Sequence, residues 1–208
     1  ILWQGPFDGG DYEGSLISWQ QWDGTDQGYA TAWMHQNEID QTESFIWAAD
    51  MNADGRVDLI WQNAVGVYVW LMNGWTIDSV VWISTEDMAG WQIVALADID
   101  ADGVGDLIWQ DAYNDDAVND GRIKAWTEWD GTDGGYVEGW IHEAPLAEGE
   151  RGIGAAADMD GDEDDDLLLQ DSNGVLYAWM MDGTSYSEVI MSSNVADNAL
   201  YEVKALAD

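Results

Sequence analysis

Residues 50–62 read Asp-Met-Asn-Ala-Asp-Gly-Arg-Val-Asp-Leu-Ile-Trp-Gln. Oxygen-bearing side chains stand at positions 1, 3, 5 and 9 of this stretch, glycine stands at position 6, and an apolar run follows at once. Calcium takes roughly six to eight oxygen ligands, and glycine permits the left-handed turn that wraps a short loop round an ion. The sequence predicts a calcium loop between two strands, with ligands from the side chains of Asp50, Asn52, Asp54 and Asp58 and the backbone carbonyl of Arg56.

The same pattern recurs at residues 98–110 and 158–170, again directly before an apolar run. One acidic stretch is explained equally well by a solvated turn, but three in the same setting favour a metal. The third copy has Glu163 where glycine is expected, and it offers Asp164 as an additional side chain. The predicted calcium ligands are Asp98, Asp100, Asp102, Asp106 and the carbonyl of Val104 in one loop, and Asp158, Asp160, Asp162, Asp164 and Asp166 in the other.

Composition excludes several classes of protein. With 208 residues, 47% of them apolar, and 15 tryptophans, the chain can bury a core and is not disordered. The formal net charge of −37 excludes binding to nucleic acid. No apolar run reaches the roughly 20 residues of a membrane helix, and the absence of Cys removes thiolate metal sites and disulfides. The remaining acidity fits a surface adapted to high salt, or one that collects divalent cations.

A unit of about 50 residues surrounds each loop. It comprises a strand before the loop, a strand after it, an alternating third strand that ends in Asn-Gly or Asp-Gly, and a fourth strand. Four short antiparallel strands repeated in this way are typical of β-propeller blades. We predict first strands at 44–49, 91–97 and 151–157, second strands at 59–62, 107–110 and 167–170, third strands at 66–73 and 174–182, and a fourth strand at 76–83.

A longer period pairs residues 1–106 with residues 107–208, since Trp-Asp-Gly-Thr-Asp at 22–26 recurs at 129–133. We therefore expect an all-β chain, a single β-propeller of two tandem blade pairs. Residues 201–208 read as a first strand beside the second strand at 1–4, which predicts a composite blade. Asp208 would open a fourth calcium loop at this seam, but the site is incomplete in this chain. The four blades either close into a ring within one chain, belong to a larger propeller, or polymerise with other copies. The expected blades are 201–208 plus 1–43, 44–90, 91–150 and 151–200.

The run from Ala49 to Asn63, with Gly66–Trp70 and Leu71-Met-Asn-Gly74 after it, resembles the FG-GAP (VCBS-type) repeats of bacterial surface proteins. It is also similar to the calcium-loop blades of integrin α-subunits and of some fungal lectins. The resemblance covers nearly the whole chain and implies a β-propeller with calcium between the first and second strands of a blade. It also implies an extracellular or cell-surface location, and the usual family number of blades is seven rather than four.

Other candidate residues have simpler explanations. Tryptophans that repeat in register, such as Trp61 and Trp109, are expected to pack between sheets. His35 and His142 are expected to be solvated on edge strands, because no nucleophile recurs beside them. Turn formation accounts for Asp23, Asp26, Asp130 and Asp133, with a second class of cation site as the alternative. The tryptophans that leave the register are candidates for exposed stacking surfaces: Trp22, Trp75, Trp91 and Trp129.

The sequence contains no phosphate loop and no repeated catalytic set, so we expect a protein without enzymatic activity. The favoured interpretation is a calcium-stabilised extracellular scaffold or adhesion module, with copies associating head to tail into a filament or surface layer. The alternative is a calcium-dependent carbohydrate-binding propeller that uses Trp22, Trp129 and the acidic insertions at 5–13 and 111–120. Other surface proteins or glycans are the expected partners.

Overall fold

The structure of the protein is a computed structural model. The structure describes residues 2–4, 16–21, 25, 30–35, 44–63, 65–86, 88, 90–111, 121–146 and 152–192. Within these ranges all regular secondary structure is β, which confirms the predicted class. No membrane-spanning helix is found among these residues.

The first sheet has three antiparallel strands, β1 (Leu2–Gln4), β2 (Leu16–Gln20) and β3 (Ala30–His35). Gln4 pairs with Leu16, and Leu16 pairs in turn with His35. The strand that the sequence predicts beside β1, at 201–208, lies outside the described residues, as does the whole insertion at 5–13.

The strands from residue 44 to residue 192 form three antiparallel sheets, each with four strands in chain order. Where bounds were predicted, they agree with the observed strands to within two residues at either end; no bounds were predicted for the strands at Ile123–Thr127, Val137–His142 and Ser185–Ser192. The second sheet comprises β4 (Ser44–Ala49), β5 (Asp58–Gln62), β6 (Val67–Asn73) and β7 (Thr76–Ser84). The third comprises β8 (Trp91–Ala97), β9 (Asp106–Asp111), β10 (Ile123–Thr127) and β11 (Val137–His142). The fourth comprises β12 (Gly152–Ala157), β13 (Asp166–Gln170), β14 (Leu176–Asp182) and β15 (Ser185–Ser192).

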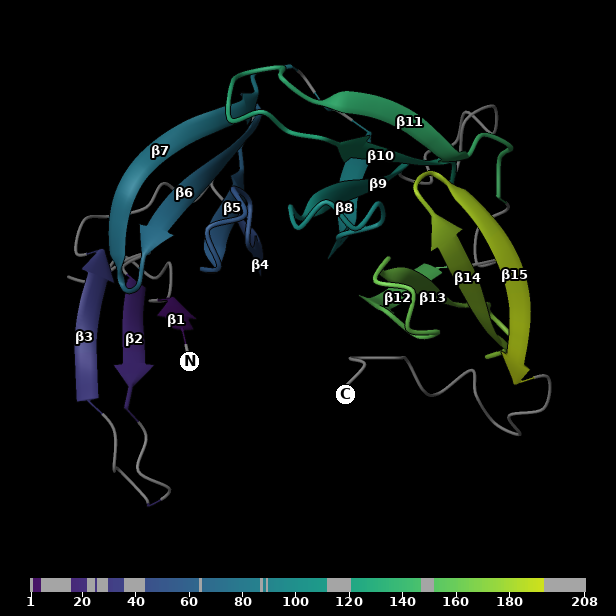
Figure 1. Ribbon diagram of the computed structural model, residues 1–208, viewed down its shortest axis with the longest axis horizontal. Coiled ribbons are helices and arrows are strands. Elements are labelled where there is room, and N and C mark those ends of the chain that lie inside the picture. The colour runs from purple at the N-terminus through teal and green to yellow at the C-terminus, as the bar shows by residue number, and fades with distance from the viewer. Residues whose placement is uncertain are drawn as a thin grey trace.

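The sheets follow one another along an arc, with β4, β8 and β12 innermost and β7, β11 and β15 outermost (Figure 1). The same irregularity marks the first strand pair of each of these sheets, a register shift at Phe45/Trp47, Ile93/Ala95 and Ile153/Ala155. The repeated irregularity shows that the sheets are structural copies of one another, as expected for a propeller-like arrangement.

Apolar side chains fill the space between successive sheets. The buried cluster between the second and third sheets includes Ile60, Val69, Leu107 and Trp109. Trp109 also packs on Trp126, with ring centroids 4.6 Å apart. The tryptophans expected in the core are buried wherever the structure describes them, at Trp61, Trp70, Trp109, Trp126 and Trp179. Aromatic area at repeated positions of the second and third strands therefore holds each sheet on the next.

Candidate metal centre

The three predicted loops connect β4 to β5, β8 to β9 and β12 to β13, the innermost strand pairs of their sheets. The first residue of each loop organises its backbone. Asp98 accepts the amide of Asp102 at 3.1 Å and that of Gly103 at 2.9 Å. Asp50 accepts the amide of Gly55 at 2.7 Å. These bonds fold each loop back over its first carboxylate and bring later side chains towards it.

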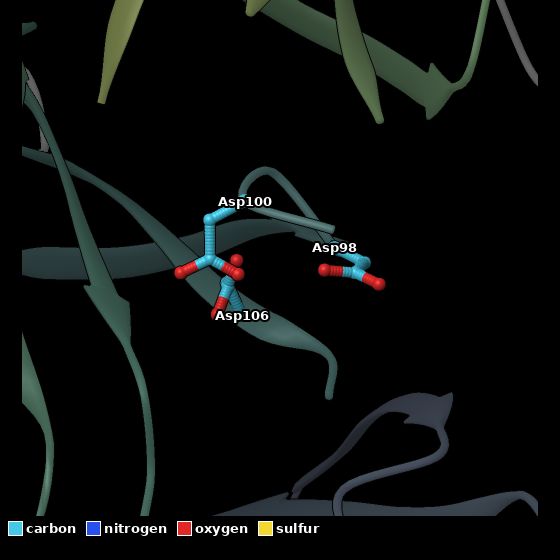
Figure 2. A group of neighbouring side chains, drawn as sticks. All are labelled: Asp98, Asp100 and Asp106. Atoms are coloured by element: carbon cyan, nitrogen blue, oxygen red, sulfur yellow. The ribbon is translucent and has the colours of Figure 1, made fainter. Parts of the chain in front are cut away.

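Two loops gather three carboxylates each. Oxygens of Asp98, Asp100 and Asp106 all lie within 4.8 Å of one another, and Figure 2 shows the three carboxylates turned towards a common space. Asp158, Asp160 and Asp166 form the same triad in the next loop. The triads thus combine the residues at positions 1, 3 and 9 of each loop, which are among the positions that the sequence predicts as ligands. In the first loop position 3 is Asn52, whose side-chain oxygen accepts the amide of Asp54 at 3.0 Å.

The predicted side chains at position 5 accept hydrogen bonds from the backbone of their own loops. Asp102 and Asp162 are not members of the triads; their carboxylates accept the amides of Val104 at 2.7 Å and Asp164 at 3.1 Å. Asp54 accepts the amide of Arg56 at 2.9 Å and pairs with its guanidinium at 2.9 Å. These residues shape the turn that presents the seventh residue, whose carbonyl the sequence predicts as a ligand.

The aspartate at position 9 ties the loop to the third strand in two of the three copies. Asp58 accepts the amides of Met51 at 3.0 Å and Met72 at 2.7 Å. Asp166 accepts the amides of Met159 and Met181, both at 2.9 Å. Both carboxylates are fully buried, with 0% exposure. Both oxygens of each therefore receive a hydrogen bond from the backbone.

Asp106 differs from the other two. Its Oδ2 accepts the amide of Ile99 at 2.9 Å, but its Oδ1 is buried without a hydrogen-bond partner. The third strand differs here, because β10 ends at Thr127, before Glu128, the position equivalent to Met72. No third-strand amide is therefore directed at Asp106. Oδ1 of Asp100 is likewise buried and without a partner.

Burial of these carboxylates opposes their ionisation. Loss of solvent, together with repulsion from the neighbouring Asp100, Asp102 and Asp98, raises the pKa of Asp106 to about 8. Burial also raises the pKa values of Asp98 and Asp100. None of the ion pairs described for the chain includes a triad carboxylate. A cation bound here would balance the negative charge of these carboxylates and would coordinate the buried oxygens that have no hydrogen-bond partner.

The raised pKa predicts the pH dependence of the calcium-free protein. The folded state holds a proton on Asp106 that the unfolded state has released, so stability should fall as pH rises from 3.8 to about 8. One unit of pKa difference corresponds to about 1.4 kcal/mol. In chelator at pH 8, the free energy of unfolding of Asp106→Asn should therefore exceed that of the parent by at least this amount. In urea unfolding, the free energy of the variant should also depend less steeply on pH. Parallel slopes for the two proteins would contradict this account.

Left-handed backbone occurs at two positions of every loop. At position 6, Gly55, Gly103 and Glu163 have φ values of +79°, +84° and +82°. Position 4 is left-handed too, at Ala53, Ala101 and Gly161. Glu163 therefore adopts the turn that glycine was expected to provide, with the steric cost of a β-carbon.

Glu163→Gly should stabilise the chain by about 1 kcal/mol, since a left-handed residue with a side chain costs about 1–2 kcal/mol. That corresponds to roughly 2–4 °C in melting temperature for a chain of this size. Gly55→Ala is the matched control, because a β-carbon there meets no atom within 4 Å and only the backbone is strained. Gly55→Ala should lower the stability of the chain by a similar amount. Equal melting temperatures for both variants and the parent would contradict the presence of backbone strain at Glu163.

The tryptophans that do not follow the repeat differ in their exposure to solvent. Trp75 is 43% exposed, as expected, and Trp91 is half-buried. The prediction for Trp129 was wrong, because it is only 7% exposed and its Nε1 donates to the Thr132 carbonyl at 2.8 Å. The turn that follows Trp129 folds back over its ring. Trp22 lies outside the described residues.

His142 was predicted to be solvated, and this too was wrong. The ring is half-buried, its Nδ1 lies 2.9 Å from the hydroxyl of Tyr186, and it packs 5.5 Å from the ring of Trp179. Both partners belong to the fourth sheet, so His142 joins β11 to that sheet. The side chain of His35 lies outside those described.

The Asp-Gly turns of the third sheet have structural roles. Asp130 accepts the amide of Thr132 at 3.0 Å, as expected for turn chemistry. Asp133 accepts the amide and the hydroxyl of Thr85, each at 3.2 Å, and so connects this turn to the residue after β7. Asp23 and Asp26 lie outside the described residues.

Two comparisons place the chain among known proteins. A model of the FG-GAP-like repeat matches residues 50–109, from the first loop to the second strand of the next sheet. No curated protein sequence matches the chain. Among solved structures, the chain is similar to an Agrocybe aegerita lectin with specific recognition of non-reducing terminal N-acetylglucosamine.

The lectin likeness has a TM-score of 0.56 at 16% sequence identity, and it covers 86% of this chain. It covers 46% of the lectin chain, so the present chain spans less than half of that protein. At this identity the likeness concerns the fold alone. The chain carries an FG-GAP-like repeat at residues 50–109, within a fold that it shares with a β-propeller lectin.

Proposed function

We propose that this chain is a non-enzymatic, calcium-stabilised propeller module of an extracellular scaffold or adhesion protein. The observation that carries the proposal is the triad Asp98–Asp100–Asp106, where two buried carboxylate oxygens have no hydrogen-bond partner. An unpaired buried charge is costly, and a cation held by these oxygens would remove that cost. FG-GAP repeats often bind calcium and are typical of extracellular proteins, which agrees with this proposal.

The donor atoms favour calcium over softer metals. Each triad supplies carboxylate oxygens, the chain has no Cys, and His142 is bonded to Tyr186 away from the loops. Hard cations prefer such oxygen sets, whereas zinc and copper sites commonly recruit imidazole or thiolate. The residues that would hold calcium are Asp98, Asp100, Asp106 and the Val104 carbonyl; Asp158, Asp160, Asp166 and the Asp164 carbonyl; and Asp50, Asn52, Asp58 and the Arg56 carbonyl.

Bound calcium would supply positive charge that neutralises the carboxylates and cross-links the innermost two strands of a sheet. The position-9 aspartates already tie two loops to the third strand, so an ion would brace three strands at one end of a sheet. In this proposal the copies associate through strand pairing, and the outer strands remain available to partners.

Equilibrium dialysis with metal analysis tests the proposal. We expect at least two calcium ions per chain, one for each complete triad. Asp100→Ala should remove one of them while leaving the fold intact by circular dichroism. Retention of no calcium by the parent chain at millimolar concentration would overturn the proposal.

A second candidate function is carbohydrate binding, favoured by the structural likeness to the N-acetylglucosamine lectin. A polar pocket of about 110 Å³ lies between the first loop and the β6–β7 hairpin, lined by residues that include Asn52, Asp54, Arg56 and Asn73. The exposed Trp75 lies in the turn of that hairpin, two residues after Asn73. Amide, carboxylate and guanidinium groups near an aromatic ring can hydrogen-bond and stack on a sugar.

A glycan array in calcium distinguishes the two candidates. A lectin should give saturable binding that Trp75→Ala and Asn73→Ala weaken, whereas Trp47→Ala, at another exposed tryptophan, should leave it unchanged. A scaffold without sugar affinity should show no saturable signal in any of these proteins.

A further inference from the structure

Successive loops are joined by one hydrogen bond that occurs twice. The amide of Gly105, the eighth residue of the second loop, donates to the carbonyl of Asp50 at 2.8 Å. The amide of Asp165, the eighth residue of the third loop, donates to the carbonyl of Asp98 at 2.7 Å. In both cases the acceptor is the first residue of the preceding loop. The loops are therefore connected in series across three sheets.

The link between the second and third loops is doubled. Besides its amide bond, Asp165 uses its carboxylate Oδ2 to accept the amide of Asp98 at 2.9 Å. Both backbone polar groups of Asp98 are thus held by a single residue of the next sheet. Asp98 in turn contributes a carboxylate to the triad of the second loop and accepts the amides of Asp102 and Gly103.

The equivalent contact between the first and second loops has no room for a side chain at Gly105. A β-carbon on Gly105 would lie 2.9 Å from Cβ of Ala49 and 3.2 Å from Cδ2 of Leu96. Glycine at this position therefore allows the backbones to meet, while aspartate at the same position of the third loop adds a second bond. The position mediates contact between loops and was not predicted as a ligand.

We propose that Asp165 is a positioning residue that couples cation binding in the third loop to cation binding in the second. This inference rests on the proposed calcium sites. An ion held by Asp158, Asp160 and Asp166 orders the loop that carries Asp165, and Asp165 then fixes the backbone of Asp98. A fixed Asp98 requires less ordering when the second loop takes its own ion. By linkage, an ion in the second loop strengthens binding in the third by the same factor.

The sign of the coupling separates this mechanism from simple electrostatics. Two dications in neighbouring loops repel each other, so direct charge interaction would make the second ion bind more weakly than the first. Preorganisation through Asp165 makes it bind more tightly. The measured sign therefore shows which effect is larger.

Calcium titration of the full chain, followed by NMR of loop amides, resolves the sites. Gly103 donates to Asp98 and reports on the second loop, whereas Gly161 donates to Asp158 and reports on the third. Asp160→Ala removes a carboxylate from the triad of the third loop without touching either bond between the loops. We expect this variant to lose the Gly161 response and to weaken calcium binding at Gly103 about fivefold or more.

Variants at residue 165 test the route of the coupling. Asp165→Ala should weaken the Gly103 site by a similar factor, and adding Asp160→Ala to it should weaken that site no further. Asp165→Asn removes the same charge but keeps an oxygen that can accept a hydrogen bond from the Asp98 amide. Its calcium affinity at the Gly103 site should therefore be close to that of the parent. Should Asp165→Ala fail to fold, Asp160→Ala and Asp165→Asn carry the test.

Three results would overturn the inference. Unchanged or tighter binding at Gly103 in Asp160→Ala would show independent or repelling sites. Equal weakening by Asp165→Asn and Asp165→Ala would assign the effect to charge instead of the hydrogen bond. A parent chain whose loops bind no calcium at all would overturn the proposed function together with this inference, and is distinguished by the absence of any Gly103 or Gly161 response.

Discussion

Removal of calcium should lower the melting temperature of this chain by at least ten degrees. An ion that binds only the folded state stabilises it by about 2.7 kcal/mol at a concentration one hundred times its dissociation constant. Two loops hold complete carboxylate triads, so the expected total is about 5 kcal/mol. For a chain of this length each kcal/mol corresponds to roughly 2–4 °C.

Differential scanning calorimetry in millimolar calcium and in chelator measures this difference, with magnesium as the control. Magnesium demands compact octahedral geometry and gives up water reluctantly, so it should restore little of the lost stability. Superimposed melts in calcium and in chelator would show that the loops are acidic turns.

Asp58→Ala should destabilise the chain by about 3 kcal/mol even without calcium. The carboxylate is fully buried and accepts the amides of Met51 and Met72, which join the loop to β6. Its loss leaves two buried donors without partners, each costing about 1–3 kcal/mol, although relief of a buried charge offsets part of this. Urea unfolding in chelator measures the change.

Asp54→Ala is the matched control for that experiment. Asp54 belongs to the same loop, but its pair with Arg56 is largely solvent-exposed, and such pairs contribute about 1 kcal/mol or less. The free energy of unfolding of the control in chelator should therefore remain close to that of the parent. Equal loss of stability in the two variants would contradict the anchoring role of position 9.

The strands could be predicted from the sequence because their signals are local. Apolar runs such as Leu59–Gln62 follow acidic loops at a constant spacing, and Asn73-Gly74 marks a hairpin between β6 and β7. The triad positions 1, 3 and 9 could be predicted for the same reason, since alternating oxygen-bearing side chains before a glycine turn are visible within nine residues.

Features that depend on distant residues could not be predicted. The bond from Met72 to Asp58 spans 14 residues and depends on the register of the third strand. The missing equivalent at Asp106 follows from the early end of β10, which has no signal in the loop. Left-handed Ala53 and Ala101 also escaped prediction, because alanine does not mark such a conformation. The bonds from position 8 lie between repeats, so a single repeat unit does not reveal them.

A crystal structure of the chain grown in calcium, with anomalous scattering recorded to identify the metal, tests the central claim most directly. The account predicts a calcium ion within about 2.3–2.6 Å of oxygens from Asp98, Asp100 and Asp106, including the Oδ1 atoms of Asp100 and Asp106 that otherwise have no partner. It predicts a second ion between Asp158, Asp160 and Asp166. Well-ordered loops holding only water, with no anomalous peak at either triad, would contradict it.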